Sequence, residues 1–166
     1  MSTDRELFDF QADRGPRWYP INDGVMGGVS VGRAHVAPDG VLKFSGVVSL
    51  ENGGGFASIR SEALPLNLQG TRAIRLRVKG DGHRYKFSLK LDAAFDSVQY
   101  QAVFQPPAGA WSTVELSYSV FAPRFRGRPV PNAPPLDPGR VVALGFLISD
   151  RQAGTFVLEV RSISAY

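Results

Sequence analysis

Cysteine is absent from the 166-residue sequence, and histidine occurs only as His35 and His83, in unrelated segments. The first absence excludes disulfides, thiolate catalysis and cysteine-held zinc, and the two histidines lack metal-ligand spacing. The motifs Gly-x-Ser-x-Gly and His-Glu-x-x-His are missing too. A glycosidase needs only two carboxylates, and four acidic residues are candidates: Asp23, Glu51, Asp81 and Asp150. Nothing in the sequence pairs them, so we expect no enzyme activity, no catalytic metal and no organic cofactor. A structural Ca²⁺ stays open, because turn carboxylates and carbonyls can ligate it.

Long apolar runs are also lacking. The longest, residues 141–148, is far shorter than a membrane span, and no basic region followed by an apolar run opens the chain. We therefore expect a cytoplasmic protein with no membrane span, and the length favours one domain over residues 1–166. The net charge of +4, from 19 Lys and Arg against 15 Asp and Glu, is mild. It permits an acidic partner, but it does not indicate nucleic-acid binding, and we expect none.

No long segment has helical spacing, and alternation with a period of two is found instead. Ile74, Leu76 and Val78 alternate with basic residues, and the pattern recurs over residues 42–50, 85–91, 98–104, 114–118 and 156–160. Residues 141–148 are apolar on both faces, which is typical of a central, doubly covered strand. Glycine (18 residues) and proline (12) separate these segments. The sequence thus predicts about eight to ten short antiparallel strands in an all-β sandwich or barrel.

Two glycine-rich segments are candidate binding loops. Residues 22–30 read Asn-Asp-Gly-Val-Met-Gly-Gly-Val-Ser, and residues 53–55 are three consecutive glycines. Glycine permits tight turns and close approach of the backbone to a ligand. Each segment could instead be a turn or a bulged hairpin that bonds only to itself. The candidate binding residues here are Trp18, Asn22, Asp23, Met26 and Phe56.

Basic residues concentrate around the turn at residues 80–83, with seven of the 19 between Arg72 and Lys90. If this turn closes a hairpin, Arg77 faces Lys86 on the outer surface, and like charges directly opposite destabilise a sheet. One interpretation is a solvated face neutralised by acids on neighbouring strands. The other is a docking patch for an acidic protein, a phosphate or a lipid surface. Asp81, the only acid in this stretch, is itself a candidate binding residue. The patch residues are Arg75, Arg77, Arg84 and Lys86.

Residues 121–140 form the least regular stretch, and long irregular loops in compact domains are often functional. Arginine alternates with other residues over 124–128, and guanidinium groups bind carboxylates and stack on rings. We predict that this loop converges with the 22–30 and 53–56 loops into one binding surface, with Arg126 and Arg128 as anion-binding groups. The competing hypothesis is internal: Asp23 or Asp81 pairs with an arginine, and the loops merely brace one another.

Several segments together carry a resemblance to a known family. Residues 22–30 are followed in order by Phe-Ser-Gly at 44–46, Gly-Gly-Phe-Ala-Ser at 54–58, Val-Lys-Gly-Asp-Gly at 78–82 and Tyr-Gln-Ala-Val-Phe at 100–104. Trp111, the Phe-Arg-Gly-Arg loop at 125–128, Leu-Gly-Phe at 144–146 and Gly-Thr-Phe at 154–156 continue the series. With these motifs the chain resembles the complex I intermediate-associated protein 30 family over nearly its whole length.

The resemblance implies a galactose-binding-like, jelly-roll β-sandwich. It also implies a chaperone-like role, because mitochondrial members help to assemble the respiratory NADH:ubiquinone oxidoreductase without known catalysis. We see neither a targeting extension nor a long N-terminal partner-binding segment. The target of the chain can therefore be a complex other than the respiratory one. A protein partner is the first expectation. The alternative is a carbohydrate-binding or small-molecule-binding module, which would need an exposed aromatic platform, for which Trp18 and Trp111 are the candidates.

Overall fold

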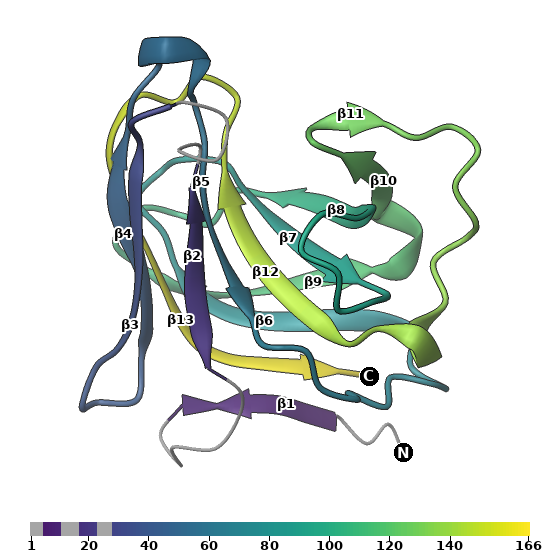
Figure 1. Cartoon of the computed structure of the whole chain (residues 1–166). Helices are drawn as coiled ribbons and strands as arrows, with labels where there is room; N and C mark the ends of the chain where they lie inside the picture. The colour runs from purple at the N-terminus through teal and green to yellow at the C-terminus, as the bar shows by residue number, and fades with distance from the viewer. Residues whose placement is uncertain (1–4, 11–16, 23–27) are drawn as a thin grey trace.

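The computed structural model describes residues 5–10, 17–22 and 28–166, and in it two antiparallel sheets face one another (Figure 1). The described residues contain strands and three short 3-10 turns, at Glu51–Gly53, Tyr118–Val120 and Pro138–Arg140. This confirms the all-β antiparallel sandwich predicted from the period-two alternation. No helix in the described ranges is long and apolar enough to cross a membrane.

The first sheet has the strand order β3-β4-β13-β6-β9, with β1 paired to the far half of β13. Its strands are β1 (Arg5–Asp9), β3 (Val31–Val36), β4 (Leu42–Val48), β6 (Ala73–Lys79), β9 (Trp111–Ser117) and β13 (Gly154–Ala165). The twelve-residue β13 is the centre of this sheet, since it pairs with β4, β6 and β1.

The second sheet has the order β11-β10-β8-β7-β12-β5-β2. Its strands are β2 (Trp18–Asn22), β5 (Ala57–Ser61), β7 (Tyr85–Lys90), β8 (Gln99–Phe104), β10 (Ala122–Phe125), β11 (Arg128–Pro129) and β12 (Ala143–Ile148). Strand β12, which contains most of the apolar 141–148 segment, lies in the middle between β7 and β5. The predicted central position is confirmed, but its outer side is the floor of a cleft, which no second layer of described residues covers.

Alternate residues of both sheets point inward and form the core. Phe44 and Phe156 from the first sheet lie 4.8 Å apart between ring centroids, and Phe87 and Phe146 from the second lie 5.1 Å apart. Tyr85 joins the layers, with its ring 6.5 Å from that of Phe156. The alternating apolar residues of segments 74–78 and 85–89 are all fully buried, as the sequence predicted.

The predicted hairpin between residues 79 and 84 is wrong. Strand β6 pairs with β13 and β9, whereas β7 pairs with β8 and β12, so residues 80–84 cross from one sheet to the other. Alternation identifies a strand and its buried face, but it does not say which sheet the strand joins. Arg77 and Lys86 therefore lie on opposite outer faces of the sandwich and do not repel each other across a hairpin.

Candidate functional site

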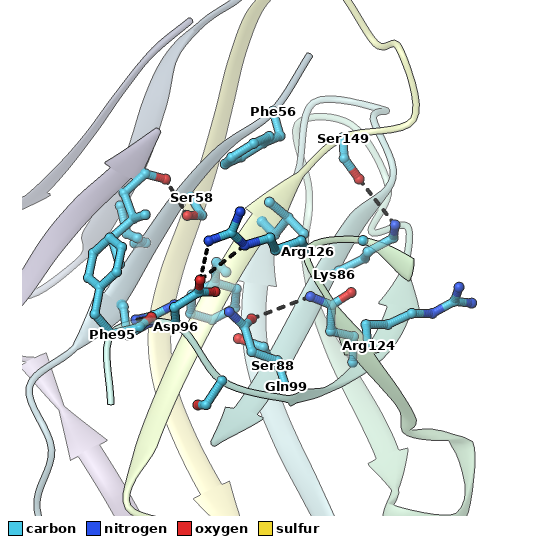
Figure 2. Close-up of a pocket in the computed structure, with 18 residues that line it drawn as sticks. Phe56, Ser58, Lys86, Ser88, Phe95, Asp96, Gln99, Arg124, Arg126 and Ser149 are labelled. Carbon is cyan, nitrogen blue, oxygen red and sulfur yellow. Dashed lines mark hydrogen bonds and ion pairs between the residues drawn. The ribbon is translucent and has the colours of Figure 1, made fainter. Parts of the chain in front are cut away.

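The outer face of the second sheet is hollowed into a cleft of about 400 Å³. Its lining comes from strands β2, β5, β12, β7, β8 and β10 and from the loops that border them (Figure 2). In sequence order the lining residues are Ile21, Phe56, Ser58, Ile59, Arg60, Lys86, Ser88, Phe95, Asp96, Ser97, Gln99, Gln101, Arg124, Arg126, Gly127, Phe146, Leu147 and Ser149.

The floor is built by strand register. Residues opposite one another on paired strands point to the same face, so each cross-strand row presents a line of side chains. One row runs Ile21, Ser58, Leu147, Lys86 across β2, β5, β12 and β7. The next runs Arg60, Gly145, Ser88, Gln101 across β5, β12, β7 and β8. The floor is therefore a grid of hydrogen-bonding side chains with small apolar patches.

Gly145 makes the floor deep in the middle of its row. A Cβ placed on it would lie 2.5 Å from the Ser88 Oγ and 3.0 Å from the Ile59 carbonyl oxygen. Both separations are shorter than van der Waals contact, so a side chain cannot be added there without displacing its neighbours. The apolar 141–148 segment thus supplies a hollow as well as core residues.

One wall of the cleft is the loop of residues 91–98 between β7 and β8. Arg60 on β5 donates from Nη1 to the Phe95 carbonyl oxygen at 2.9 Å, and its guanidinium carbon lies 5.7 Å from the centre of the Phe95 ring. Lys90 holds the loop from below, because its Nζ donates to the Ala94 carbonyl at 2.5 Å and to the Ser97 Oγ at 2.7 Å. The loop therefore has a fixed position over the sheet.

Lys90 was expected on a solvated face, yet it is only 2% exposed. Burial lowers its pKa to about 8, and repulsion from the Arg60 guanidinium adds to the effect, while Asp92 and Asp96 oppose it. Asp92 anchors the same loop by accepting from the Ser97 Oγ at 2.8 Å, and this hydrogen bond lowers the pKa of Asp92. A cation beneath the loop adds positive potential to the cleft.

Arg126 crosses the cleft from the turn between β10 and β11 (Figure 2). Its Nε donates to the Asp96 Oδ2 at 3.0 Å, and its Nη2 donates to the same oxygen. The turn depends on left-handed backbone at Arg126 (φ 50°) and Gly127 (φ 78°). The hydrogen bond from Arg126 lowers the pKa of Asp96, so this carboxylate is ionised at neutral pH.

The described residues of the lining include four cations and one carboxylate. The cations are Arg60, Lys86, Arg124 and Arg126, and the carboxylate is Asp96. Lys86 is partly neutralised just outside the lining, since its Nζ lies 3.3 Å from the Asp150 Oδ1 and 3.1 Å from the Ser149 Oγ. The cleft therefore has an excess of positive charge.

Three segments predicted to converge do so in part. Phe56 and Arg126 line the same cleft, and Asn22, at the end of β2, pairs with Ala57 beside it. Asp23 and Met26 fall outside the described residues. Arg128 is exposed on β11 and does not line the cleft. Phe56 and Arg126 thus line one cleft and Arg128 does not, while a shared binding surface of the three loops stays a prediction.

Trp18 and Asp81 lie away from the cleft. Trp18 packs into the core, with its ring 5.5 Å from that of Phe8 and 5.7 Å from that of Phe146. Trp111 lies on the other sheet, 4.6 Å from the Arg161 guanidinium carbon. Neither tryptophan is therefore a platform in the cleft.

Asp81 belongs to the crossover between the sheets. It accepts from the backbone N–H of Val157 at 2.8 Å, the hydroxyl of Tyr85 at 3.0 Å and the backbone N–H of His83 at 3.1 Å. Burial alone would raise the pKa of Asp81, but these hydrogen bonds outweigh burial and lower it. The competing hypothesis paired Asp81 with an arginine. In the described part of the chain its partner is instead His83, whose Nδ1 lies 2.9 Å from the Asp81 Oδ2.

The four residues of the predicted basic patch do not form one surface. Arg75 and Arg77 lie on the outer face of the first sheet, where Arg75 is 3.5 Å from the Glu115 carboxylate and Arg77 donates to the Thr113 Oγ1 at 3.2 Å. Lys86 lines the cleft of the second sheet, and Arg84 lies in the crossover. The interpretation of a face neutralised by acids on neighbouring strands therefore holds for Arg75.

Sequence reasoning missed most of the cleft. Arg60, Ser88, Gln99, Gln101, Arg124 and the 91–98 loop with Phe95 and Asp96 were not singled out as site residues. The polar residues on the outer positions of β7 and β8 were visible in the alternation. What was missing was the pairing of β5, β12, β7 and β8 as neighbours, which brings these positions together.

Solved structures with a similar fold include carbohydrate-binding modules. A family 11 module of a cellulosomal cellulase from Clostridium thermocellum matches 99% of this chain and 95% of its own, with a TM-score of 0.69 and 17% identity. The module from the same organism in complex with a β-1,3-1,4-mixed-linked tetrasaccharide matches 98% of this chain and 94% of its own, with a TM-score of 0.67 and 17% identity. At such identity the likeness shows the fold alone, a galactose-binding-like jelly-roll sandwich.

The sequence also identifies the family to which the chain belongs. The model of the complex I intermediate-associated protein 30 family matches residues 8–160, and the chain belongs to this family. An uncharacterized protein of Schizosaccharomyces pombe is 29% identical over 167 residues, which cover 87% of this chain and 75% of that protein. The resemblance noted from the motifs is thereby confirmed.

Proposed function

We propose that this protein is a non-catalytic binding protein that holds an extended segment of a protein partner in the cleft of the second sheet. The observation that carries the proposal is the lining: cations, amides and hydroxyls converge on an open floor with aromatic side chains at its border. Such a surface offers many hydrogen bonds and charge contacts to a bound chain.

The described residues of the cleft offer few groups for chemistry. Among them there is no histidine, and their one carboxylate, Asp96, is paired with Arg126. In the described residues no group of three or more histidine and acidic side chains could hold a metal ion. A hydrolase needs a second carboxylate or an activated nucleophile. These findings support binding as the activity.

Membership of the family supports a role in assembly. The family is described as associated with intermediates of complex I, so the partner we propose is a subunit of a respiratory NADH:ubiquinone oxidoreductase or of another multi-subunit complex. The partner would be held while its final neighbours are still absent. No part of this role requires a cofactor.

Photo-crosslinking in the native cell tests the proposal. Phe95, which is 59% exposed at the border of the cleft, is replaced by p-benzoylphenylalanine, which keeps the phenyl ring. The control carries the same probe at Thr113, which is exposed on the first sheet. We expect discrete protein adducts from position 95 only, and we expect Lys86→Ala with Arg124→Ala to remove them. Equal adducts from both positions, or none from position 95, would contradict the proposal.

Glycan binding is the second candidate, and the exposed ring of Phe95 favours it. Sugar rings stack on aromatic faces, and the amides of Gln99 and Gln101 could bond hydroxyl groups on the floor. The fold shared with carbohydrate-binding modules is compatible with this alternative. Calorimetric titration with the mixed-linked tetrasaccharide decides: binding that Phe95→Ala abolishes would establish the glycan function in place of the protein partner.

A further inference from the structure

Among the described residues, one ion pair crosses the cleft. Arg126, in the turn after β10, pairs with Asp96, in the 91–98 loop. Both side chains are well exposed, at 59% and 40%. An exposed ion pair contributes little to stability, because water screens it and both side chains lose freedom. A contribution to the stability of the fold therefore does little to explain this contact.

The geometry of the pair is also incomplete. Nε and Nη2 of Arg126 both bond the Oδ2 of Asp96, so the guanidinium engages one oxygen of the carboxylate. Guanidinium and carboxylate pair best through two parallel hydrogen bonds, one to each oxygen. A carboxylate supplied by a ligand can make that arrangement.

We infer that Asp96 imitates, on Arg126, a carboxylate of the ligand of the cleft, and that the ligand is an acidic extended peptide. The inference rests on the proposed function and gives its chemistry. In the bound state a Glu or Asp of the peptide replaces Asp96 on Arg126, and Asp96 turns outward.

The charge of the site supports an anionic ligand. Arg124 forms no ion pair with a carboxylate among the described residues, and the guanidinium of Arg60 bonds only a carbonyl and stacks on Phe95. Lys90 beneath the loop adds a further cation. A neutral glycan would gain nothing from this excess, whereas successive carboxylates on a peptide would neutralise it.

The spacing of the floor supports a peptide. Floor residues repeat two positions apart along each strand, as Lys86 and Ser88 do on β7 and as Gln99 and Gln101 do on β8. Such positions are about 6.8 Å apart, which is also the repeat of side chains on one face of an extended peptide. An extended chain lying along the strands could therefore meet each contact in register.

Fluorescence anisotropy with three labelled peptides tests the inference. The probes are ten-residue peptides of alternating Glu and Ser, Lys and Ser, and Gln and Ser. The protein is used as the wild type and as Asp96→Asn, Arg126→Gln and Arg77→Gln. Arg77→Gln is the matched control, because it removes the same charge from the outer face of the first sheet. Oligogalacturonate is the fourth probe, as an acidic ligand that is not a peptide.

We expect the wild type to bind only the Glu-Ser peptide. Asp96→Asn should tighten its binding by about two- to fivefold, the equivalent of releasing one exposed ion pair. Arg126→Gln should weaken it by at least tenfold, and Arg77→Gln should leave it unchanged.

Three results would overturn the inference. Weaker binding by Asp96→Asn would show that Asp96 contacts the ligand instead of imitating it. A larger effect of Arg77→Gln than of Arg126→Gln would place the binding face on the other sheet. Tighter binding of oligogalacturonate than of the Glu-Ser peptide would make the ligand an acidic glycan. If position 95 still crosslinks a protein partner while the acidic peptide fails to bind, the proposed function stands and only its acidic chemistry is wrong.

Discussion

Gly127 controls the position of Arg126, whose guanidinium crosses the cleft. It has a left-handed φ of 78° directly after Arg126, and a Cβ there would meet nothing within 4 Å. Gly127→Ala should therefore cost only backbone strain, about 1 kcal/mol of unfolding free energy. Gly109 is a matched control, because it has a φ of 74° and equally open surroundings away from the cleft.

We expect Gly127→Ala and Gly109→Ala to lose similar stability in urea denaturation. Only Gly127→Ala should also weaken binding of the Glu-Ser peptide, because the strain moves Arg126. Equal binding by both variants would show that the turn does not position the guanidinium.

Lys90 should make the free energy of unfolding increase as the pH rises above neutral. Its pKa is about 8 in the folded protein and 10.5 when unperturbed, so the unfolded chain binds more protons between these values. The contribution of Lys90 to the free energy of unfolding therefore rises as pH increases through 8, and it stops rising near 10.5. Between pH 7.5 and 9.5 the gain should be about 1–2 kcal/mol relative to Lys90→Met, which has no titrating group. Denaturation curves of both proteins at each pH give the difference, and a parallel pH dependence would contradict the assignment.

At the scale of elements, the crossover from β6 to β7 is fixed by Asp81, which bonds Val157 on one sheet and Tyr85 on the other. Asp81→Asn removes the charge and leaves part of these donors unpaired, so it should cost about 2–4 kcal/mol of unfolding free energy. The matched control is Asp39→Asn in an exposed turn, which should change stability by less than about 0.5 kcal/mol.

The same carboxylate gives a pH dependence at the acidic end. Because the pKa of Asp81 is lowered below 3.8, its contribution is present above that value and is lost as pH falls through the lowered pKa. Asp81→Asn should therefore flatten the acid limb of the stability profile. An unchanged acid limb would mean that the crossover bonds contribute little.

The strands with clear alternation and their buried faces could be predicted from the sequence, but their partners could not. Strands β1, β2 and β3 were not predicted, and β10 and β11 lie in the stretch taken as irregular. The alternation over 85–91 predicted Tyr85 and Phe87 in the core correctly, but it placed Lys90 in water, because the loop that covers this residue leaves no local signal. The bulge between Val160 and Ser162 was equally invisible: it shifts the register, so that Val160 and Ile163 both point inward. Sheet membership depends on contacts between distant residues, and the cleft follows from sheet membership.

At the scale of the whole molecule, the two outer faces differ in how their charges are arranged. On the first sheet, Glu159 neutralises Lys43 and Lys79 at 3.7 and 3.0 Å, and Glu115 lies beside Arg75. Among the described residues, the cleft of the second sheet has Asp96 beside Arg126 and Asp150 beside Lys86, and it has no carboxylate paired with Arg60 or Arg124. The mild net charge of the sequence thus conceals a local excess on one face.

Binding of the Glu-Ser peptide should accordingly depend on salt. Exposed charges are screened within about 8 Å at physiological ionic strength, so raising NaCl from 50 to 300 mM should weaken binding by about three- to tenfold. The Gln-Ser peptide serves as the uncharged reference. Salt-independent binding of the acidic peptide would show that contacts other than charge hold it.

The position of β13 also determines when this chain can fold. Its residues, 154–165, stand between β4 and β6, and without them the first sheet separates into the pairs β3-β4 and β6-β9. A growing chain on the ribosome therefore carries two unjoined strand pairs, whose open edges can pair with other chains. The sheet closes only when residues 154–165 are available, through contacts between residues far apart in the sequence, and such long-range closure is slow. Folding of this sandwich is consequently completed only when β13, the last of its strands along the sequence, is available to pair.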